Sequence, residues 1–593
     1  MLMFQRRFST QNTLARLGSL ALVGILAGIA PGIGRAEISV EVNGVDAEIR
    51  ANVFVFLSLE RFRKQTGLDS EMAARLQERV PGEVRAALRP FGYYDPVIES
   101  SLTPTGTEGN YKARIDIEPG PAVFMENVDV QVTGAGAAAF QRILQRPALR
   151  IGERLSHAKY DTMKSDLQRT AATLGFLDAR LTQSELRVDP QQHKARVTLA
   201  LETGPRYHFG ATTIEQTVVN ESLIRKYVRY RQDEPFDATE LLRTQFALDD
   251  SQYFSNVEVI PGEPDRTEHV VPIQIRAAAN RRHRYSYGVG YGTDTQVRGT
   301  ASWENRAVNH AGHRFRVDIK AASQAQSLET RYLIPFGDPA LEKFSLELST
   351  RAADVGDLKT TSTEFQPSIT QIRGGWQRVL FGIVTRTTTR TAASSTPRKT
   401  DTLFIPGISY ASVPEGYLGE ALFSRGLFAE LRGSHSALGS DANFLQLRLQ
   451  GERVVDLSRR WHVLLRGQLG ASLVPKLTDL PGSQRFFAGG DRSVRGFGFD
   501  DLSPLDAQGN KIGGRHMLAA TAEIIRDLPR NLSVAVFADA GNAFDKFGDR
   551  LEYSAGIGIR WRLPVVTVGI DVAQALSVSG KSPRLHLNFS PKL

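Results

Sequence analysis

Apolar and polar residues alternate along most of the second half of the chain, and this pattern restricts the possible fold more than any other feature. In one such segment Arg314, Arg316 and Asp318 alternate with Phe315 and Val317. A period of two is typical of a β-strand that lies between two different environments. Segments of this kind recur at intervals of about 20 residues to the end of the chain, which predicts a transmembrane antiparallel β-barrel of about 16 strands.

The glycine residues fit a curved barrel wall. The chain contains 52 glycines and 27 prolines. In the first strand of the predicted barrel, Gly288 and Gly290 share one face, whereas Tyr285 and Tyr287 share the other. Small residues on an inner face relieve crowding where a barrel curves.

The N-terminus has the composition of a secretory signal peptide. Residues 1–36 contain four arginines, no acidic residue, and an apolar stretch from Leu17 to Ala30 that small residues follow. We predict cleavage after Ala36; an uncut anchor helix and a twin-arginine signal are the alternatives. Removal of this segment lowers the formal charge from +9 by the four arginines to +5, which weakens the case for a nucleic-acid ligand.

Composition excludes several classes of protein. Hydrophobic residues make up 41% and charged residues 23% of the chain, which excludes a wholly disordered chain. No apolar run long enough for a membrane-spanning helix follows residue 40. The absence of cysteine excludes disulfides, thiolate metal sites and cysteine nucleophiles.

The chain also lacks the sequence patterns of the common enzyme classes. It contains no nucleophile elbow, no phosphate-binding loop and no H-E-x-x-H zinc motif. His310 and His313 flank a turn that we interpret as a periplasmic hairpin rather than a metal site. We therefore predict that the protein is not an enzyme and requires no cofactor.

The first half of the chain contains a motif that occurs three times. A glycine precedes an aromatic residue at Gly92 and again at Gly175, and a Gly-Pro pair closes an alternating strand at Gly120 and again at Gly204. A third, shorter copy lies around Tyr253, where the first glycine is replaced. Repetition at a constant spacing indicates an array of similar small domains.

Each repeat is predicted to be an α+β unit. The segment Ser70–Leu88 places Met72, Leu76 and Val80 on one helical face, and two alternating strands follow the glycine-aromatic step. A helix layer over a small sheet is the expected packing, and it leaves an edge strand open.

These repeats resemble the POTRA domains of the outer-membrane protein assembly family, with a generic periplasmic scaffold array as the alternative. The resemblance implies three α+β POTRA domains followed by the barrel. The predicted divisions are a signal peptide at 1–36, POTRA domains at 37–122, 123–205 and 206–277, and an outer-membrane β-barrel at 278–593.

The segment from residue 485 to residue 497, RFFAGGDRSVRGF, resembles the sixth-loop signature of the BamA/TamA-like assembly factors. The resemblance implies that this loop folds back into the barrel lumen, where Arg495 pairs with carboxylates of the inner wall. The motif residues are Arg485, Gly489, Gly490, Ser493, Arg495, Gly496 and Phe497.

Two carboxylates downstream are candidate partners of Arg495. Asp539 lies in a segment that resembles the F-x-D-x-G strand of the family, and Glu523 matches the acidic position of the preceding strand. A guanidinium that meets fixed carboxylates would offset the conformational entropy that the loop loses in the lumen. The alternative is that both carboxylates are solvated lumen charges.

The last ten residues alternate like a terminal strand, but Pro591 cannot donate a hydrogen bond to a neighbouring strand. We therefore expect the first and last strands to pair over a short length, as in the lateral gate that the resemblance implies. The residues assigned to this gate are Tyr285, Tyr287, Gly288 and Gly290 in the first strand, and Leu585, Leu587 and Phe589 in the last.

Three repeats and about 16 strands fit the TamA-type branch of the family. The resemblance implies a protein of the Gram-negative outer membrane whose periplasmic POTRA domains receive unfolded outer-membrane clients, such as autotransporters, and whose lateral gate inserts them. It also implies a TamB-like partner, anchored in the inner membrane, that binds the first POTRA domain. The alternative is a two-partner-secretion-type transporter or a passive outer-membrane channel.

Overall fold

The computed structural model describes most of the chain, and its residues form two compact units. The first unit ends at Glu202 and the second includes everything from Thr203 onward, with residues 170–178 added to the second. The predicted signal peptide lies outside the described residues. Within the described part, no helix has both the length and the apolar character needed to cross a membrane. The described ranges are 38–63, 70–105, 110–294, 296–391, 399–413, 426–563 and 566–591.

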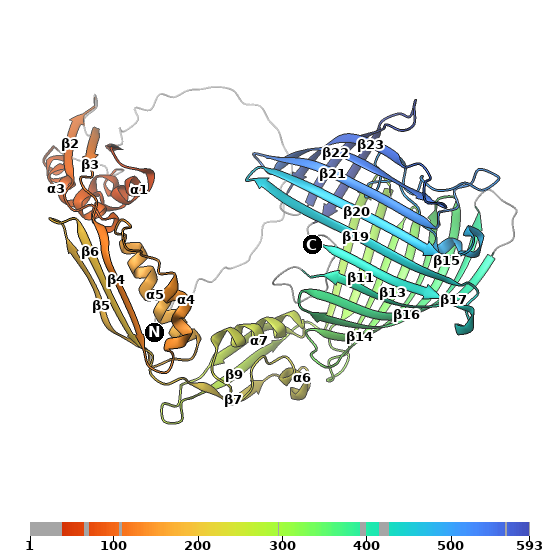
Figure 1. The fold of residues 1–593 in the computed structure, drawn as a ribbon, viewed down its shortest axis with the longest axis horizontal. Helices are drawn as coiled ribbons and strands as arrows, with labels where there is room; N and C mark the ends of the chain where they lie inside the picture. Colours follow the sequence, from red (N-terminus) through yellow and green to blue (C-terminus); the bar gives the residue numbers. More distant parts are fainter. Residues whose placement is uncertain are drawn as a thin grey trace, which may run out of the picture. The chain divides into compact units, whose positions relative to one another are not determined.

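The first unit begins with a module in which three helices cover a three-stranded sheet of order β1-β3-β2 (Figure 1). Strand β1 is parallel to β3, and β2 is antiparallel to it. Asp46 caps the first helix by accepting a hydrogen bond from the backbone N–H of Ile49 at 2.9 Å. The elements are β1 (Ile38–Asn43), α1 (Ala47–Phe56), α2 (Ser58–Arg61), α3 (Ser70–Leu88), η1 (Arg89–Phe91), β2 (Val97–Pro104) and β3 (Tyr111–Glu118).

Helix α3 occupies the range that the sequence predicted, but one residue of its apolar face was assigned wrongly. Leu76 and Val80 are buried in the core of the module, together with Ala73. Met72 is exposed, because the buried stripe of the helix is centred nearly a quarter turn away from it.

The second module has the same topology, with the sheet order β4-β6-β5. Its long helix α5 buries Met163 and Leu167. The elements are β4 (Phe124–Thr133), η2 (Ala137–Phe140), α4 (Gln141–Gln145), α5 (His157–Thr173), β5 (Arg180–Asp189) and β6 (Lys194–Glu202).

The third module repeats this topology within the second unit, with the sheet order β7-β9-β8. Strand β9 runs two residues beyond the boundary predicted at residue 277. The elements are β7 (His208–Glu215), α6 (Glu221–Arg225), α7 (Ala238–Asp250), β8 (Phe254–Pro261) and β9 (Val270–Ala279).

Each module has a residue in the left-handed conformation directly before the repeated aromatic residue. Gly92 and Gly175 have φ angles of 84° and 83°. In the third module Gln252 occupies the corresponding place before Tyr253, and its φ is 63°. The third copy thus keeps the backbone conformation although it has lost the residue that adopts it most readily.

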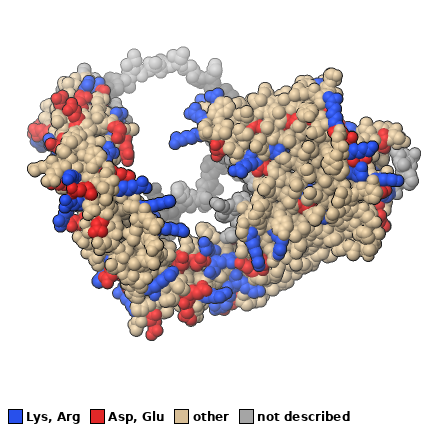
Figure 2. All heavy atoms as spheres, in the orientation of Figure 1, with Lys and Arg blue, Asp and Glu red and all other residues tan. Residues whose placement is uncertain are grey.

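Sixteen antiparallel strands, β10 to β25, form the barrel in consecutive order, which confirms the predicted strand number. Tyr287 and Val289 are 77% and 82% exposed because they point away from the lumen. Uncharged residues dominate the barrel face seen in Figure 2, and Lys and Arg gather toward its ends. The strands are β10 (His283–Gly292), β11 (Gln296–Asn305), β12 (Arg314–Ala322), β13 (Ala325–Pro335), β14 (Glu342–Val355), β15 (Leu358–Arg373), β16 (Trp376–Thr391), β17 (Lys399–Ser412), β18 (Leu427–Ser434), β19 (Phe444–Ser458), β20 (Trp461–Leu473), β21 (His516–Leu528), β22 (Leu532–Phe544), β23 (Glu552–Arg562), β24 (Val566–Ala575) and β25 (Arg584–Pro591).

The third module packs directly against turns of the barrel. Its hydrophobic core includes Ala307 and Ala340, which belong to these turns. The hydroxyl of Tyr253 donates to the carbonyl oxygen of Gly312 at 2.5 Å, and the N–H of Asn220 donates to the carbonyl oxygen of His310 at 2.8 Å. The turn at residues 306–313, which we interpreted as a periplasmic hairpin, therefore contacts the third module.

An ion pair strengthens this contact. The guanidinium of Arg229 binds both carboxylate oxygens of Asp338, one of them at 3.0 Å. We expect Arg229→Ala to weaken the docking by about 1.5–3 kcal/mol, the usual contribution of hydrogen bonds to a charged group. Hydrogen–deuterium exchange in the turn at 306–313 should become faster. Arg225→Ala, which removes an exposed pair with Glu221, is the control, and equal exchange in both variants would contradict the prediction.

Candidate functional site

The connection between β20 and β21, residues 474–515, folds into the barrel lumen. Its apolar residues form a buried cluster with Ala543 and Ala575 of the wall. The hydrophobic effect from burial of these side chains helps to hold the loop against the barrel wall. The loop residues of this cluster are Phe486, Ala488, Val494, Phe497 and Leu502.

Arg485, the first residue of the motif, holds the two ends of this loop together. Its Nε donates to the carbonyl oxygen of Leu480 at 2.8 Å and its Nη1 to that of Ile512 at 3.2 Å. The residue thus acts on the loop itself.

The glycines of the motif allow tight turns and close contact with the wall. Gly489 and Gly490 have φ angles of 104° and 94°, which favour glycine. Ser493 accepts a hydrogen bond from the N–H of Gly489 at 3.2 Å. A Cβ at Gly496 would lie 2.6 Å from the Cβ of Ser554, so the loop backbone touches the wall there.

We expect Gly496→Ala to displace the loop from the wall, at a cost of about 1–3 kcal/mol for overpacking. The added methyl would lie 2.8 Å from the Cα of Ala575, a backbone atom that cannot move aside. Limited proteolysis of the folded barrel should then cut the loop faster. Gly498→Ala is a matched control, because its nearest neighbour would be 3.5 Å away; similar cleavage of the two variants would refute the steric argument.

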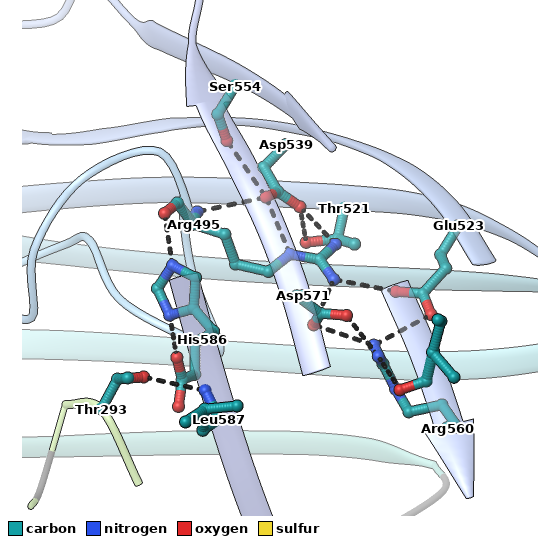
Figure 3. A network of polar contacts seen from close by, with 12 residues as sticks. Thr293, Arg495, Thr521, Glu523, Asp539, Ser554, Arg560, Asp571, His586 and Leu587 are labelled. Atoms are coloured by element: carbon teal, nitrogen blue, oxygen red, sulfur yellow. Dashed lines mark hydrogen bonds and ion pairs between the residues drawn. The ribbon is translucent and has the colours of Figure 1, made fainter. Parts of the chain in front are cut away.

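The motif arginine, Arg495, is buried and binds Asp539 through three donors (Figure 3). Its backbone N–H and its Nε donate to Oδ2 at 3.1 and 3.0 Å, and its Nη2 donates to Oδ1 at 2.9 Å. Thr521 and Ser554 donate to the same carboxylate at 2.9 and 3.1 Å. Asp539 is therefore fully hydrogen-bonded, as a buried charge must be.

Strand β22 turns Asp539 inward by simple alternation. Phe537 and Asp539 are both 2% exposed, whereas Val536 is 62% exposed. The guanidinium carbon of Arg495 lies 3.2 Å from the centre of the Phe537 ring, which adds a cation–π contact. The predicted second partner, Glu523 on β21, accepts from Nη1 of Arg495 at 3.0 Å.

Two members of this network were not predicted from the sequence. Asp571 on β24 lies 3.5 Å from Nη1 of Arg495, and Arg560 on β23 binds Asp571 and Glu523 at 2.9 and 3.4 Å. The group therefore combines two guanidiniums with three carboxylates, which polarise one another in a low-dielectric setting. A signal was present, because Asp571 is the single charged residue of its strand.

His586 on β25 connects the loop to the last strand, and it was also missed. Its Nε2 lies 2.7 Å from the carbonyl oxygen of Arg495, and its Nδ1 contacts Asp491. The N–H of Asp491 donates to Asp294, in the turn after β10, at 2.6 Å. The alternation of Leu585, His586 and Leu587 could have indicated that the histidine points inward.

The first and last strands meet only at one end of the barrel. Within the described residues, Gly292 and Asn588 form the one Cα partner pair between β10 and β25. The adjacent N–H of Thr293 donates to the carbonyl oxygen of Leu587 at 3.2 Å. By contrast, β25 pairs with β24 along its whole length. The short pairing was expected, but its cause was not Pro591, since the ladder already ends at Asn588.

Within the described strands, none of the gate residues predicted in β10 pairs with one predicted in β25. Leu587 contacts Thr293, whereas Tyr285, Tyr287, Gly288 and Gly290 pair with β11 on their other side. Leu585 pairs with β24. The backbone of Phe589 pairs with β24 as well, and its side chain lies outside the described part.

Comparison with known families finds a match in each half of the chain. The Omp85 superfamily domain matches residues 308–590, and the domain described as POTRA domain, TamA domain 1, matches residues 39–119. These two matches cover the first module and the barrel from the turn after β11 onward.

Curated relatives and a solved structure agree with this assignment. The outer membrane protein assembly factor BamA of Nitratidesulfovibrio vulgaris is 33% identical over 137 residues, 22% of this chain and 17% of that protein. BamA of Neisseria meningitidis is 22% identical over 69% of this chain and 60% of that protein. The chain thus spans less than two thirds of either relative. The crystal structure of BamA from Haemophilus ducreyi lacking POTRA domains 1–3 covers 79% of this chain and 99% of its own, with 15% identity and a TM-score of 0.64, and so has the same fold.

The fold and the lumenal loop define an outer-membrane barrel that carries N-terminal POTRA modules. The chain belongs to the Omp85 superfamily and is of its BamA/TamA-like type. The barrel lies in the outer membrane of a Gram-negative bacterium, with the POTRA modules in the periplasm. The two relatives from Nitratidesulfovibrio vulgaris and Neisseria meningitidis are named as outer membrane protein assembly factors.

Proposed function

We propose that this chain inserts unfolded outer-membrane proteins, such as autotransporters, through a lateral opening between β10 and β25. The observation that carries the proposal is the seam, where a single partner pair joins two strands while neighbouring strands pair over their whole length. Separation of β10 from β25 would therefore break far fewer hydrogen bonds than separation of any neighbouring pair.

The seam also offers a template. Along His283–Tyr291, one edge of β10 is paired with β11, whereas no described residue of β25 pairs with the other edge. Unpaired backbone groups in lipid cost several kcal/mol each, so an extended client strand would gain free energy by pairing there. Insertion driven in this way needs neither catalysis nor a cofactor.

A passive channel or a two-partner-secretion-type transporter is the alternative. The anchored loop argues against an open channel, because its apolar cluster and the buried Arg495 occupy the lumen. Single-channel conductance separates the possibilities: we expect small, irregular openings, and a large, steady pore would favour the channel.

We further propose that the first POTRA module binds a TamB-like partner anchored in the inner membrane. The support is the match of residues 39–119 to the first POTRA domain of TamA. Both β1 and β2 are edge strands of this module and could pair with a partner strand. Photo-crosslinkers placed along either strand should capture a single envelope protein; the absence of adducts along both would argue against docking there.

Depletion of the protein followed by a census of outer-membrane barrels tests the main proposal. We expect some barrel proteins to decline in the outer membrane and to accumulate as unfolded chains in the periplasm. An unchanged census would contradict an assembly role.

A further inference from the structure

Three side chains that can bind a divalent cation meet at the extracellular end of the seam. Asp294 belongs to the turn after β10, Asp491 to the lumenal loop, and His586 to β25. One ligand atom from each residue lies within 4.8 Å of the other two. The three residues therefore come from three segments that are far apart in the sequence.

A buried carboxylate oxygen without a partner points into this group. Asp294 is 6% exposed, and its Oδ1 accepts no hydrogen bond. This oxygen lies 4.0 Å from Nδ1 of His586, while Oδ2 of the same carboxylate accepts the N–H of Asp491. A buried oxygen of a carboxylate is costly when it is unsatisfied, and a cation between the three residues would satisfy it.

The histidine is oriented as a metal ligand would be. Its Nε2 lies 2.7 Å from the carbonyl oxygen of Arg495, which can only accept, so Nε2 carries a hydrogen. This fixes the ring and turns Nδ1 toward Asp491 and Asp294. A second ring nitrogen that donates to a backbone carbonyl is the usual support of a metal-bound histidine.

We propose that Asp294, Asp491 and His586 form a binding site for a divalent transition-metal ion of the Zn²⁺ class. One imidazole and two carboxylates suit Zn²⁺, whereas Mg²⁺ and Ca²⁺ prefer ligand sets made of oxygen alone. On binding, the ion displaces the proton between Nδ1 of His586 and Oδ1 of Asp491, and this proton is released to the solvent. It would tie the last strand to both the lumenal loop and the turn that follows the first strand. The proposed site does not rest on the proposed insertion of clients, because its three ligands meet when the seam is closed.

Calorimetric titration of the full chain with ZnCl₂, in detergent and without a polyhistidine tag, tests the site. We expect one Zn²⁺ per chain and a loss of affinity of at least about tenfold when one ligand is removed. The variants are Asp294→Asn, Asp491→Asn and His586→Gln. Because an unfolded variant would also fail to bind, circular dichroism of each variant must match that of the wild type.

His462 provides a matched control. It also lies between two aspartates, but Nδ1 faces Asp456 at 2.6 Å and Nε2 faces Asp527 at 3.2 Å. Because the two aspartates contact different nitrogens of the ring, the three residues cannot hold one ion. His462→Gln should bind Zn²⁺ like the wild type.

A second measurement detects the link between segments. Zn²⁺ should slow the proteolysis of loop 474–515 in the wild type and in His462→Gln, but not in folded Asp294→Asn or Asp491→Asn. The proposal is overturned if the wild type binds no stoichiometric Zn²⁺, if His586→Gln binds it as tightly as the wild type, or if His462→Gln loses as much affinity as the ligand variants.

Discussion

Arg495→Ala is expected to release the lumenal loop from the wall while the barrel still folds. Removal of the guanidinium leaves Asp539 and Glu523 buried with fewer partners, and breaking a buried charge pair in this way costs about 3–5 kcal/mol. The backbone hydrogen bonds between the strands do not involve this side chain. The substitution therefore mainly destabilises the attachment of the loop to the wall. A change of this size would raise the population of released loop by roughly a hundredfold or more.

Protease added to intact cells measures this release, since loop 474–515 lies on the same rim as the turn after β10. Cleavage within the loop should be much faster in Arg495→Ala than in the wild type. Arg492→Ala is the matched control, because Arg492 belongs to the same loop and is exposed. Equal access in Arg495→Ala and the wild type would rule out an anchoring role for the arginine.

A disulfide across the seam is expected to reduce client insertion to the level of a depleted strain. The 293–587 pair carries the backbone hydrogen bond, so the adjacent pair, Gly292 and Asn588, is of the non-hydrogen-bonded type. Cα atoms in such pairs are about 4.5 Å apart, which a disulfide can span. The chain has no cysteine, so the two engineered thiols have no competitors.

The experiment compares the oxidised double variant, Gly292→Cys with Asn588→Cys, with the same protein after reduction. Insertion should return on reduction, and each single variant should remain active. Full activity of the oxidised protein would show that the seam need not open. It would favour the passive channel or the two-partner-secretion-type transporter.

The fold was predictable because its signals are local. A period of two that recurs along the chain predicts a barrel, and the glycine-aromatic step predicts the repeated module. The exchange of glycine for Gln252 hid the third copy only partly, since Tyr253 follows in the same place. Met72 was misassigned because the sequence does not show where the buried face of a helix ends and its exposed face begins.

The site was predictable only where a motif exists. Arg495, Asp539 and Glu523 could be grouped by their resemblance to a known loop and its wall. Asp571 and His586 could not, because their strands are brought beside the loop by closure of the barrel, which no local pattern encodes. Alternation shows that both side chains point into the barrel. It does not show which inward-pointing residues lie at the same height along the barrel axis.

The short link between the third module and the barrel has a mechanical consequence. Strand β9 is the central strand of its sheet, ends at Ala279, and continues after residues 280–282 into β10. The same module shares a hydrophobic core with barrel turns through Ala307 and Ala340. The module is therefore a rigid arm attached to β10, one of the two strands that flank the seam, so a force applied to the module in the periplasm would act on the seam.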